Sequence, residues 1–328
     1  MKITLKLISL VAMLIALNWM YKQSKFIAFV DEHADQYLQL EKIKNCDVIY
    51  ISASSNFPPE NIQEADPRKI SQFISDYFPT FQFEAINKPA SHAGVYRKLL
   101  HIFPKDSEAK TFIITMNMRS FGPSWVNSDL ETALNQSNVF YNHRPVLFNR
   151  LLLSLNAYDN KPAYERNELV QTQWANDPLP FEAPKNTVKN WCAVEKWGDW
   201  RNPTRQLADQ FIKQYGFVID ENNSRVKDFD AICEIAEKRS YRLVFNILAE
   251  NIETADSLVG KDLTSLMTQN AKWLESRYSE KGFKVVNNLH ILKASNFTDK
   301  DFPTEHYDEE GRKIIAKNIA SSLKTIIE

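Results

Sequence analysis

A serine and a histidine far apart in the chain could together perform nucleophilic catalysis. Ser54 follows a short apolar run at residues 48–51, and His306 lies near the far end in the segment Thr-Glu-His-Tyr-Asp. A serine hydroxyl is a weak nucleophile at neutral pH unless a base within hydrogen-bond reach accepts its proton, and imidazole titrates in the right range. Such a pair would perform acyl transfer through an acyl-serine, with water or another hydroxyl as the acceptor.

The elements around these residues predict a sheet that would bring them to one edge. Apolar and β-branched runs predict strands at residues 46–51, 81–86, 110–116, 241–248 and 283–292, with helical patterns between most of them. This alternation is typical of right-handed crossovers and a parallel sheet. The loops after the first three strands, and the segment around His306, would then meet at the carboxyl edge, where open α/β sheets place their chemistry.

A long stretch at about 123–240 interrupts this alternation, and it exceeds what one crossover helix needs. We predict that it is a helical insertion that caps the sheet edge, with helices at residues 146–155, 203–215 and 228–238. It holds five of the seven tryptophans, which could stack on sugar rings but are more often core residues: Trp125, Trp174, Trp191, Trp197 and Trp200. The predicted divisions are an anchor at 1–25, a helical stalk at 26–45 and one α/β domain at 46–328 that contains the insertion.

The first residues predict export and attachment to a membrane. Lys2 and Lys6 precede an apolar run at residues 7–20, and Lys22 and Lys25 follow it. Charged and apolar regions in this order are typical of a secretory signal, but bulky residues occupy the positions where cleavage requires small ones. We therefore expect an uncleaved transmembrane anchor with the domain on the periplasmic or extracytoplasmic side. A cleaved signal and a core helix of a cytosolic α/β protein are the alternatives.

Composition excludes or disfavours several other classes of protein. Lysine and arginine number 40 against 41 aspartate and glutamate, so no overall field indicates a nucleic-acid partner. The seven glycines form no phosphate-binding loop, and the six histidines form no metal-binding cluster, so we expect neither a metal nor another cofactor. Three cysteines without a Cys-x-x-Cys pair indicate small buried hydrophobes, although Cys192 and Cys233 could pair in an oxidising compartment.

The order of these parts resembles the SGNH/GDSL hydrolase superfamily. Ser52-Ala-Ser54 stands where that family has Gly-Asp-Ser, Gly94 is the nearest match to its oxyanion glycine, and Thr115-Met-Asn117 stands where it has Gly-x-Asn. The segment from Thr304 to Ala316 resembles the family's histidine loop and the following helix, and also the Asp-Thr-His-Trp segment of the alginate O-acetylation branch.

The resemblance implies a flavodoxin-like three-layer α/β/α fold and a set of site residues. Ser54 would be the nucleophile and His306 the base, with the backbone N–H groups of Ser54 and Gly94 and the Asn117 side chain as oxyanion donors. An anchor leading directly into the serine strand is similar to DltD-like acyltransferases, which implies an esterase or O-acyltransferase acting on a small-molecule or glycan substrate of the cell envelope.

The sequence departs from the family's pattern at the serine motif and at the acid position, so the identity of the acid stays open. The family's Gly and Asp are Ser52 and Ala53, and its acid position falls on Pro303 or Thr304. We predict that Asp301 supports His306 from a neighbouring position, with Asp299 and Glu305 as alternatives, because a triad is defined by geometry rather than by spacing. Arg119 could pair with any carboxylate or bind a carboxylate or phosphate of the substrate. The alternative function is a catalytically degenerate SGNH-like protein that binds glycan or scaffolds an envelope complex.

Overall fold

The structure is a computed structural model, and it describes residues 2–25, 28, 39, 40, 43, 45–60, 62–142, 144–159, 161–194, 199 and 201–327. Most of the predicted stalk at 26–45 lies outside the described residues, as do Trp197 and Trp200. The division of the chain at residues 25, 45, 123 and 240 therefore stays a prediction.

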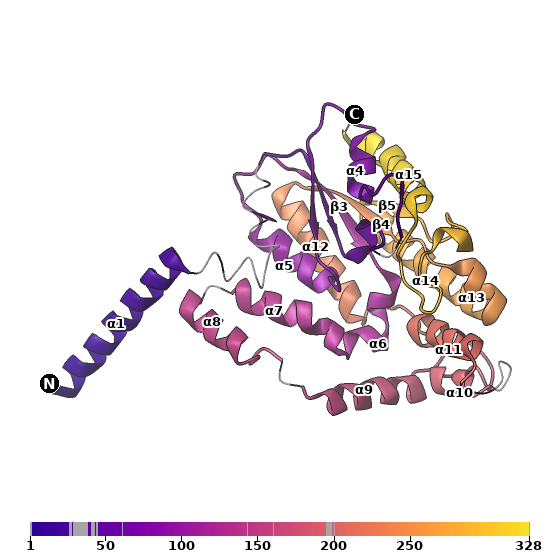
Figure 1. Cartoon of the computed structure of the whole chain (residues 1–328), viewed down its shortest axis with the longest axis horizontal. Coiled ribbons are helices and arrows are strands. Elements are labelled where there is room, and N and C mark those ends of the chain that lie inside the picture. The colour runs from indigo at the N-terminus through magenta and orange to yellow at the C-terminus, as the bar shows by residue number, and fades with distance from the viewer. Residues whose placement is uncertain are drawn as a thin grey trace.

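The centre of the molecule is a five-stranded sheet in the order β2-β1-β3-β4-β5 (Figure 1). Every neighbouring pair is parallel, as the alternating pattern predicts. The strands are β1 (Val48–Ser52), β2 (Phe83–Asn87), β3 (Thr111–Met116), β4 (Arg242–Ile247) and β5 (Lys284–Asn287). The predicted fifth strand was too long, because residues 288–292 form a turn after β5.

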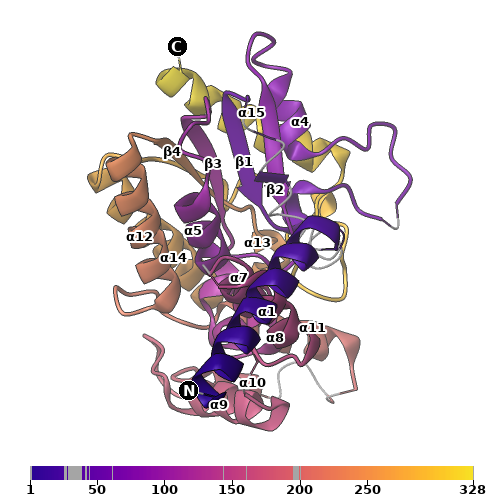
Figure 2. The same cartoon turned by 90° about the vertical axis from the view of Figure 1, so that its left-hand side faces the viewer.

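Helices cover both faces of the sheet and make three layers, which confirms the predicted α/β/α fold (Figure 2). On one face α5 (Ala93–Ile102), α12 (Ser224–Arg239) and α14 (Lys261–Glu280) pack against Ile49 and Ile51. On the other face α4 (Ile70–Ser75) and α15 (Glu309–Ile327) pack against Val48 and Tyr50. Successive side chains of β1 thus enter opposite core layers, as the period of a strand requires.

The segment between β3 and β4 is helical, and its last helix belongs to the sheet layers. α12 packs along α5 and contacts β4, so it serves as the crossover helix that returns the chain to the sheet. The predicted helix at 203–215 matches α11. The other elements between β3 and α12 are η2 (Met118–Phe121), α6 (Pro123–Val126), η3 (Asp129–Glu131), α7 (Thr132–Phe140), α8 (Val146–Ser154), α9 (Ala163–Asn176), α10 (Val188–Cys192) and α11 (Pro203–Tyr215).

Three of the insertion's tryptophans are core residues. Trp125 and Trp191 are buried, and Trp174 packs against the main core cluster. They are therefore not an exposed platform for stacking on sugar rings. The three cysteines are unpaired, so Cys192 and Cys233 form no disulfide.

One helix, α1 (Lys2–Ser24), projects away from the α/β domain (Figure 1). The stretch Lys2–Gln23 is long and apolar enough to cross a membrane, and none of it is buried in the protein. A secretory signal would have the same length and composition. Two short helices, α13 (Ile252–Leu258) and η5 (Ala294–Asn296), flank the carboxyl edge of β4 and β5.

Candidate active site

The loop that carries Ser54 is held by a buried hydrogen-bond network. β1 ends at Ser52, and Ser54 begins the 3-10 helix η1 (Ser54–Asn56). The Ser52 hydroxyl donates to Asn87 Oδ1 at 2.9 Å, and Asn56 Nδ2 donates to the same oxygen at 2.8 Å. Asn56 Oδ1 in turn accepts from the backbone N–H of Ser71 at 2.9 Å. These bonds tie the loop to the end of β2 and to α4, so Ser54 has a fixed support.

The structure brings Ser54, His306 and an aspartate into one hydrogen-bonded chain. Ser54 Oγ lies 3.1 Å from His306 Nε2. The other ring nitrogen of His306, Nδ1, lies 2.9 Å from Asp299 Oδ2. A serine hydroxyl, an imidazole and a carboxylate in this order form the arrangement that activates a serine nucleophile.

The carboxylate in this chain is Asp299 and not Asp301, which corrects the prediction. Asp301 is exposed to solvent, whereas the Asp299 carboxylate contacts His306 and accepts a bond from Thr304 Oγ1 at 2.5 Å. Asp299 can reach the ring because its segment runs antiparallel to that of His306: the N–H of Thr298 donates to the His306 carbonyl at 3.0 Å, and Phe297 pairs with Tyr307. Spacing along the chain does not reveal this pairing.

Glu305, the other alternative acid, faces the opposite way from His306. Its two carboxylate oxygens pair with the Arg119 guanidinium, at 2.5 Å to Nε and 2.6 Å to Nη2. Asn117 Nδ2 also donates to Glu305, at 2.9 Å. In this structure the Asn117 amide, predicted as an oxyanion donor, therefore bonds Glu305, and Arg119 takes the first of its two predicted roles and pairs with a carboxylate. Both side chains are buried and bind the histidine loop to the end of β3.

A second carboxylate lies beside this buried pair. Glu250 is buried, and the Tyr215 hydroxyl of α11 donates to it. Burial, and then the nearby charge of Glu305, hold the pKa of Glu250 well above its usual value of 4.5. Arg119 remains cationic, because although burial alone would lower its pKa, the Glu305 charge raises it above the usual value. The cluster thus holds one ion pair and one carboxyl group whose neutral form is favoured.

Gly94 does not lie in the site. It is in the first turn of α5, and its backbone N–H donates to Nδ1 of His92, the residue that caps this helix. A β-carbon at this position would meet Leu134 and Asp228, so the glycine serves the packing of α5 against the insertion. The Gly94 N–H, predicted as an oxyanion donor, is thus bonded to His92, and Gly94 is not part of the lining of the cavity beside Ser54.

The hydrogen-bonded residues Ser54, His306 and Asp299 border a cavity of about 470 Å³. An apolar wall made by Phe57, Pro58, Pro59 and Ile62 is also part of its lining, with Glu60 in the same segment. Pro89, from the loop after β2, lies in the same lining. Ala90, the next residue, has φ 58°, a left-handed backbone that is unfavourable for a residue with a β-carbon. Neither Pro89 nor Ala90 stands out in the sequence.

Among the residues that the structure describes, no group of three or more histidine, cysteine, aspartate or glutamate side chains is placed to hold a metal ion.

No protein-family model and no curated protein matches the chain. Solved structures do match it. The chain is similar to GDSL-like hydrolases. A GDSL-like lipase from Bacteroides thetaiotaomicron is 9% identical, with 92% of this chain and 98% of that chain covered and a TM-score of 0.39.

Two further matches have comparable values. A putative acylhydrolase from Bacteroides fragilis is 6% identical, with coverage of 89% and 95% and a TM-score of 0.41. A lipase/acylhydrolase from Enterococcus faecalis is 7% identical, with coverage of 85% and 96% and a TM-score of 0.39. At such low identities and TM-scores these GDSL-like proteins do not identify the activity or substrate of this chain.

Proposed function

We propose that the protein is a membrane-anchored serine esterase or O-acyltransferase of the SGNH/GDSL type. Its substrate would be a carboxylic ester of a cell-envelope glycan or of another surface molecule, in keeping with the resemblance to DltD-like and alginate O-acetylation proteins. The observation that carries this proposal is the chain from Ser54 Oγ through the two nitrogens of His306 to Asp299, with contacts of 3.1 and 2.9 Å.

The proposed reaction has two halves. Ser54 Oγ attacks the ester carbonyl while His306 Nε2 takes the hydroxyl proton, and Asp299 stabilises the imidazolium that forms. The tetrahedral adduct then breaks its bond to the alcohol, which leaves with the proton from His306, and acyl-Ser54 remains. Water or an acceptor hydroxyl, deprotonated by His306, attacks this ester and releases Ser54 with its proton restored. Water gives hydrolysis and a sugar hydroxyl gives transfer.

The oxyanion donors in this proposal are backbone N–H groups, since the Asn117 amide and the Gly94 N–H have other partners. The N–H of Ser54 begins η1, and the first N–H groups of a helix have no acceptor within it. The N–H of Ala90 is in the strained loop beside the cavity. In a crystal of the phosphonylated protein, the phosphonyl oxygen should accept from both groups, and an oxygen directed to solvent would contradict this assignment.

The apolar wall of the cavity supports an ester with an apolar acyl group. Phe57, Pro58, Pro59 and Ile62 would contact the acyl chain, while the sugar or other acceptor approaches from the solvent side of His306. Because small hydrophobic pockets discriminate weakly, we expect short acyl esters to differ by roughly tenfold per methylene. A series of acyl esters of one alcohol, compared by kcat/KM, measures this preference, and a flat series would contradict it.

A serine-directed fluorophosphonate probe tests the activity itself. The full chain in detergent should gain one phosphonyl group, mapped by peptide mass spectrometry to Ser54. Ser54→Ala should lose the label, and Ser55→Ala is the matched control because the Ser55 side chain is buried beside it. Absence of labelling in the native protein, or labelling that persists in Ser54→Ala, would overturn the proposal.

The alternative of a degenerate binding protein makes the opposite prediction for this experiment. This alternative would be favoured if Ser54 Oγ lay far beyond hydrogen-bond reach of the His306 ring, with no carboxylate behind the ring. The contacts of His306 with Ser54 and with Asp299 favour the active enzyme over this alternative.

A further inference from the structure

α8 exposes an apolar face that the protein does not cover. Phe148 and Leu151 of α8 are 47% and 51% exposed, and Leu155, just after the helix, is 67% exposed. Their spacing puts the three side chains on one side of the helix. The opposite side is partnered, since Leu153 is buried against Val139 and Phe140 of α7. An apolar stripe of this kind on a short helix is typical of a surface that contacts lipid or another protein.

The neighbour of this helix is α1, the helix able to cross a membrane. α8 packs along α1, and the two helices enclose an apolar groove lined by Val11, Leu14 and Ile15. Asn18 Oδ1 of α1 accepts the backbone N–H of Leu147 at 3.0 Å. This N–H lies in the first turn of α8, where no carbonyl of the helix can accept it. In lipid an unpaired N–H is costly, so this bond suits two helices that share an apolar environment.

The contact lies near the end of α1 that leads to the domain. At about 1.5 Å per residue, Asn18 lies roughly 8 Å and Leu14 roughly 14 Å along the axis from Gln23. If α1 spans the membrane, its contact with α8 therefore runs from the level where headgroups meet acyl chains, at Asn18, into the acyl region, at Leu14. Interfacial helices are buried to about 5–10 Å, so the contact begins at their level and extends deeper.

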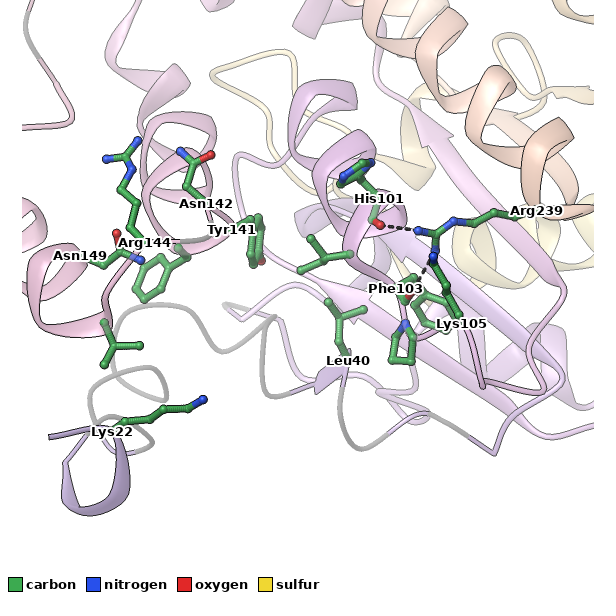
Figure 3. Close-up of a pocket in the computed structure, with 14 residues that line it drawn as sticks. Lys22, Leu40, His101, Phe103, Lys105, Tyr141, Asn142, Arg144, Asn149 and Arg239 are labelled. Atoms are coloured by element: carbon green, nitrogen blue, oxygen red, sulfur yellow. Dashed lines mark hydrogen bonds between the residues drawn. The ribbon is translucent and has the colours of Figure 1, made fainter. Parts of the chain in front are cut away.

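A cationic cavity lies between the end of α1, α8 and the α/β domain (Figure 3). Its volume is about 620 Å³, and Val146 and Asn149 of α8 are part of its lining. Three cationic residues are part of its lining: Lys22 of α1, Lys105 of the loop after α5, and Arg144 of the segment before α8. Its described lining residues include no aspartate or glutamate. Arg239 is held at the wall, because its guanidinium donates to the carbonyls of His101 and Phe103.

We propose that α8 and this cavity form a second membrane contact that binds anionic phospholipid. Phe148, Leu151 and Leu155 would enter the acyl region beside α1, and Lys22, Lys105 and Arg144 would bind the lipid phosphate. The inference rests on the proposed membrane anchoring by α1. Charge favours an anionic lipid over a zwitterionic one, because cations next to a membrane are attracted to its negative surface. Two contacts instead of one would fix the orientation of the domain, and of its active site, relative to the bilayer.

Depth-dependent quenching tests the position of α8. The full chain with Cys192→Ser would carry one fluorophore at Leu151→Cys, in nanodiscs whose lipids bear a quencher on the acyl chain. Tyr77→Cys, at an exposed position just after α4, is the matched control, and Leu14→Cys reports α1. We expect quenching at 151 to be several-fold stronger than at 77. Equal quenching at 151 and 77, with strong quenching at 14, would overturn this inference alone, whereas weak quenching at 14 would overturn the anchoring itself.

Native mass spectrometry tests the choice of lipid. In detergent, the full chain should retain phosphatidylglycerol several-fold more than phosphatidylcholine. Lys105→Gln with Arg144→Gln should remove this preference, while Lys317→Gln with Lys324→Gln, the same change of charge on exposed residues of α15, should leave it. Equal retention of the two lipids, an equal loss in both double variants, or displacement of the lipid by inorganic phosphate would overturn the proposal.

Discussion

Glu305 and His306 are neighbours in the chain, yet they belong to two different electrostatic environments. His306 and its partner Asp299 have side chains that are 36% and 40% exposed, and they face the cavity. Glu305 and its partner Arg119 have side chains that are 4% and 10% exposed, and they face the core. Both are contacts between a carboxylate and a nitrogen base or cation, but only the first is open to a substrate.

The difference follows from the extended backbone of this loop. From Pro303 to Asp308 the residues alternate between buried and half-buried, as in a strand with one face on the core. The buried positions fix the loop through Glu305 and through Tyr307, whose hydroxyl donates to the Ala249 carbonyl at 2.9 Å. The half-buried positions, Thr304 and His306, both contact Asp299. We infer that the buried pair positions the loop and the exposed pair performs the chemistry.

His306→Gln should show most clearly that the two pairs have different roles, because it should affect activity far more than stability. Removing the base should lower kcat/KM for an acyl ester by on the order of 10⁴-fold or more, because the serine hydroxyl then has no acceptor for its proton. The free energy of unfolding should change by less than about 1 kcal/mol, since the ring is partly exposed. Ester hydrolysis and urea denaturation measure the two quantities. A large loss of stability would show that His306 is structural.

Glu305→Ala should have the opposite profile. It leaves the Arg119 cation buried without its partner, which typically costs about 3–5 kcal/mol, and urea denaturation measures this loss. Replacing both residues, as Arg119→Met with Glu305→Leu, should recover most of the stability, because an apolar pair needs no desolvated charges. If the ion pair positions His306, kcat should stay low in this double variant while the fluorophosphonate still reaches Ser54 slowly. Full recovery of kcat would assign the pair a role in stability alone.

Glu250→Gln should have a smaller effect, visible in the pH dependence of stability. The pKa of Glu250 is raised in the folded protein, so its neutral form contributes stability that is lost as pH rises above about 4.5 and through the folded pKa. The Glu250→Gln variant lacks this titration. Its free energy of unfolding, relative to that of the native protein, should therefore rise from pH 5 to pH 8. Thermal unfolding at the two pH values checks this, and parallel curves for the two proteins would contradict it.

The sequence predicts the fold better than it predicts the site. Apolar runs and their spacing suffice for the parallel sheet and for helices such as α11, because burial determines those patterns. Ser54 and His306 were predicted to form a pair from their places at strand ends, and they lie within hydrogen-bond distance. The partners of Asn117, Arg119 and Gly94 could not be predicted in this way, since side chains from the same loop can face the cavity or the core.

The identity of the carboxylate that contacts His306 could not be predicted from spacing either, although the sequence could have excluded one candidate. Asp299 and Asp301 lie two residues apart, and only the antiparallel pairing of Phe297 with Tyr307 decides which carboxylate reaches the ring. The apolar residues Pro303 and Tyr307 are four positions apart, a spacing that an extended segment with one buried face allows. Such a segment would have placed Glu305 and His306 on opposite faces, and so excluded Glu305 as the acid.

The pair of substitutions Asp299→Asn and Asp301→Asn tests the central claim most directly. Both remove one negative charge from the same loop, but only Asp299 contacts His306. We predict that Asp299→Asn lowers kcat/KM for an acyl ester by roughly 10²–10⁴-fold, while Asp301→Asn stays within about twofold of the native protein. Equal effects of the two substitutions, or a larger loss in Asp301→Asn, would contradict a catalytic chain formed by Ser54, His306 and Asp299.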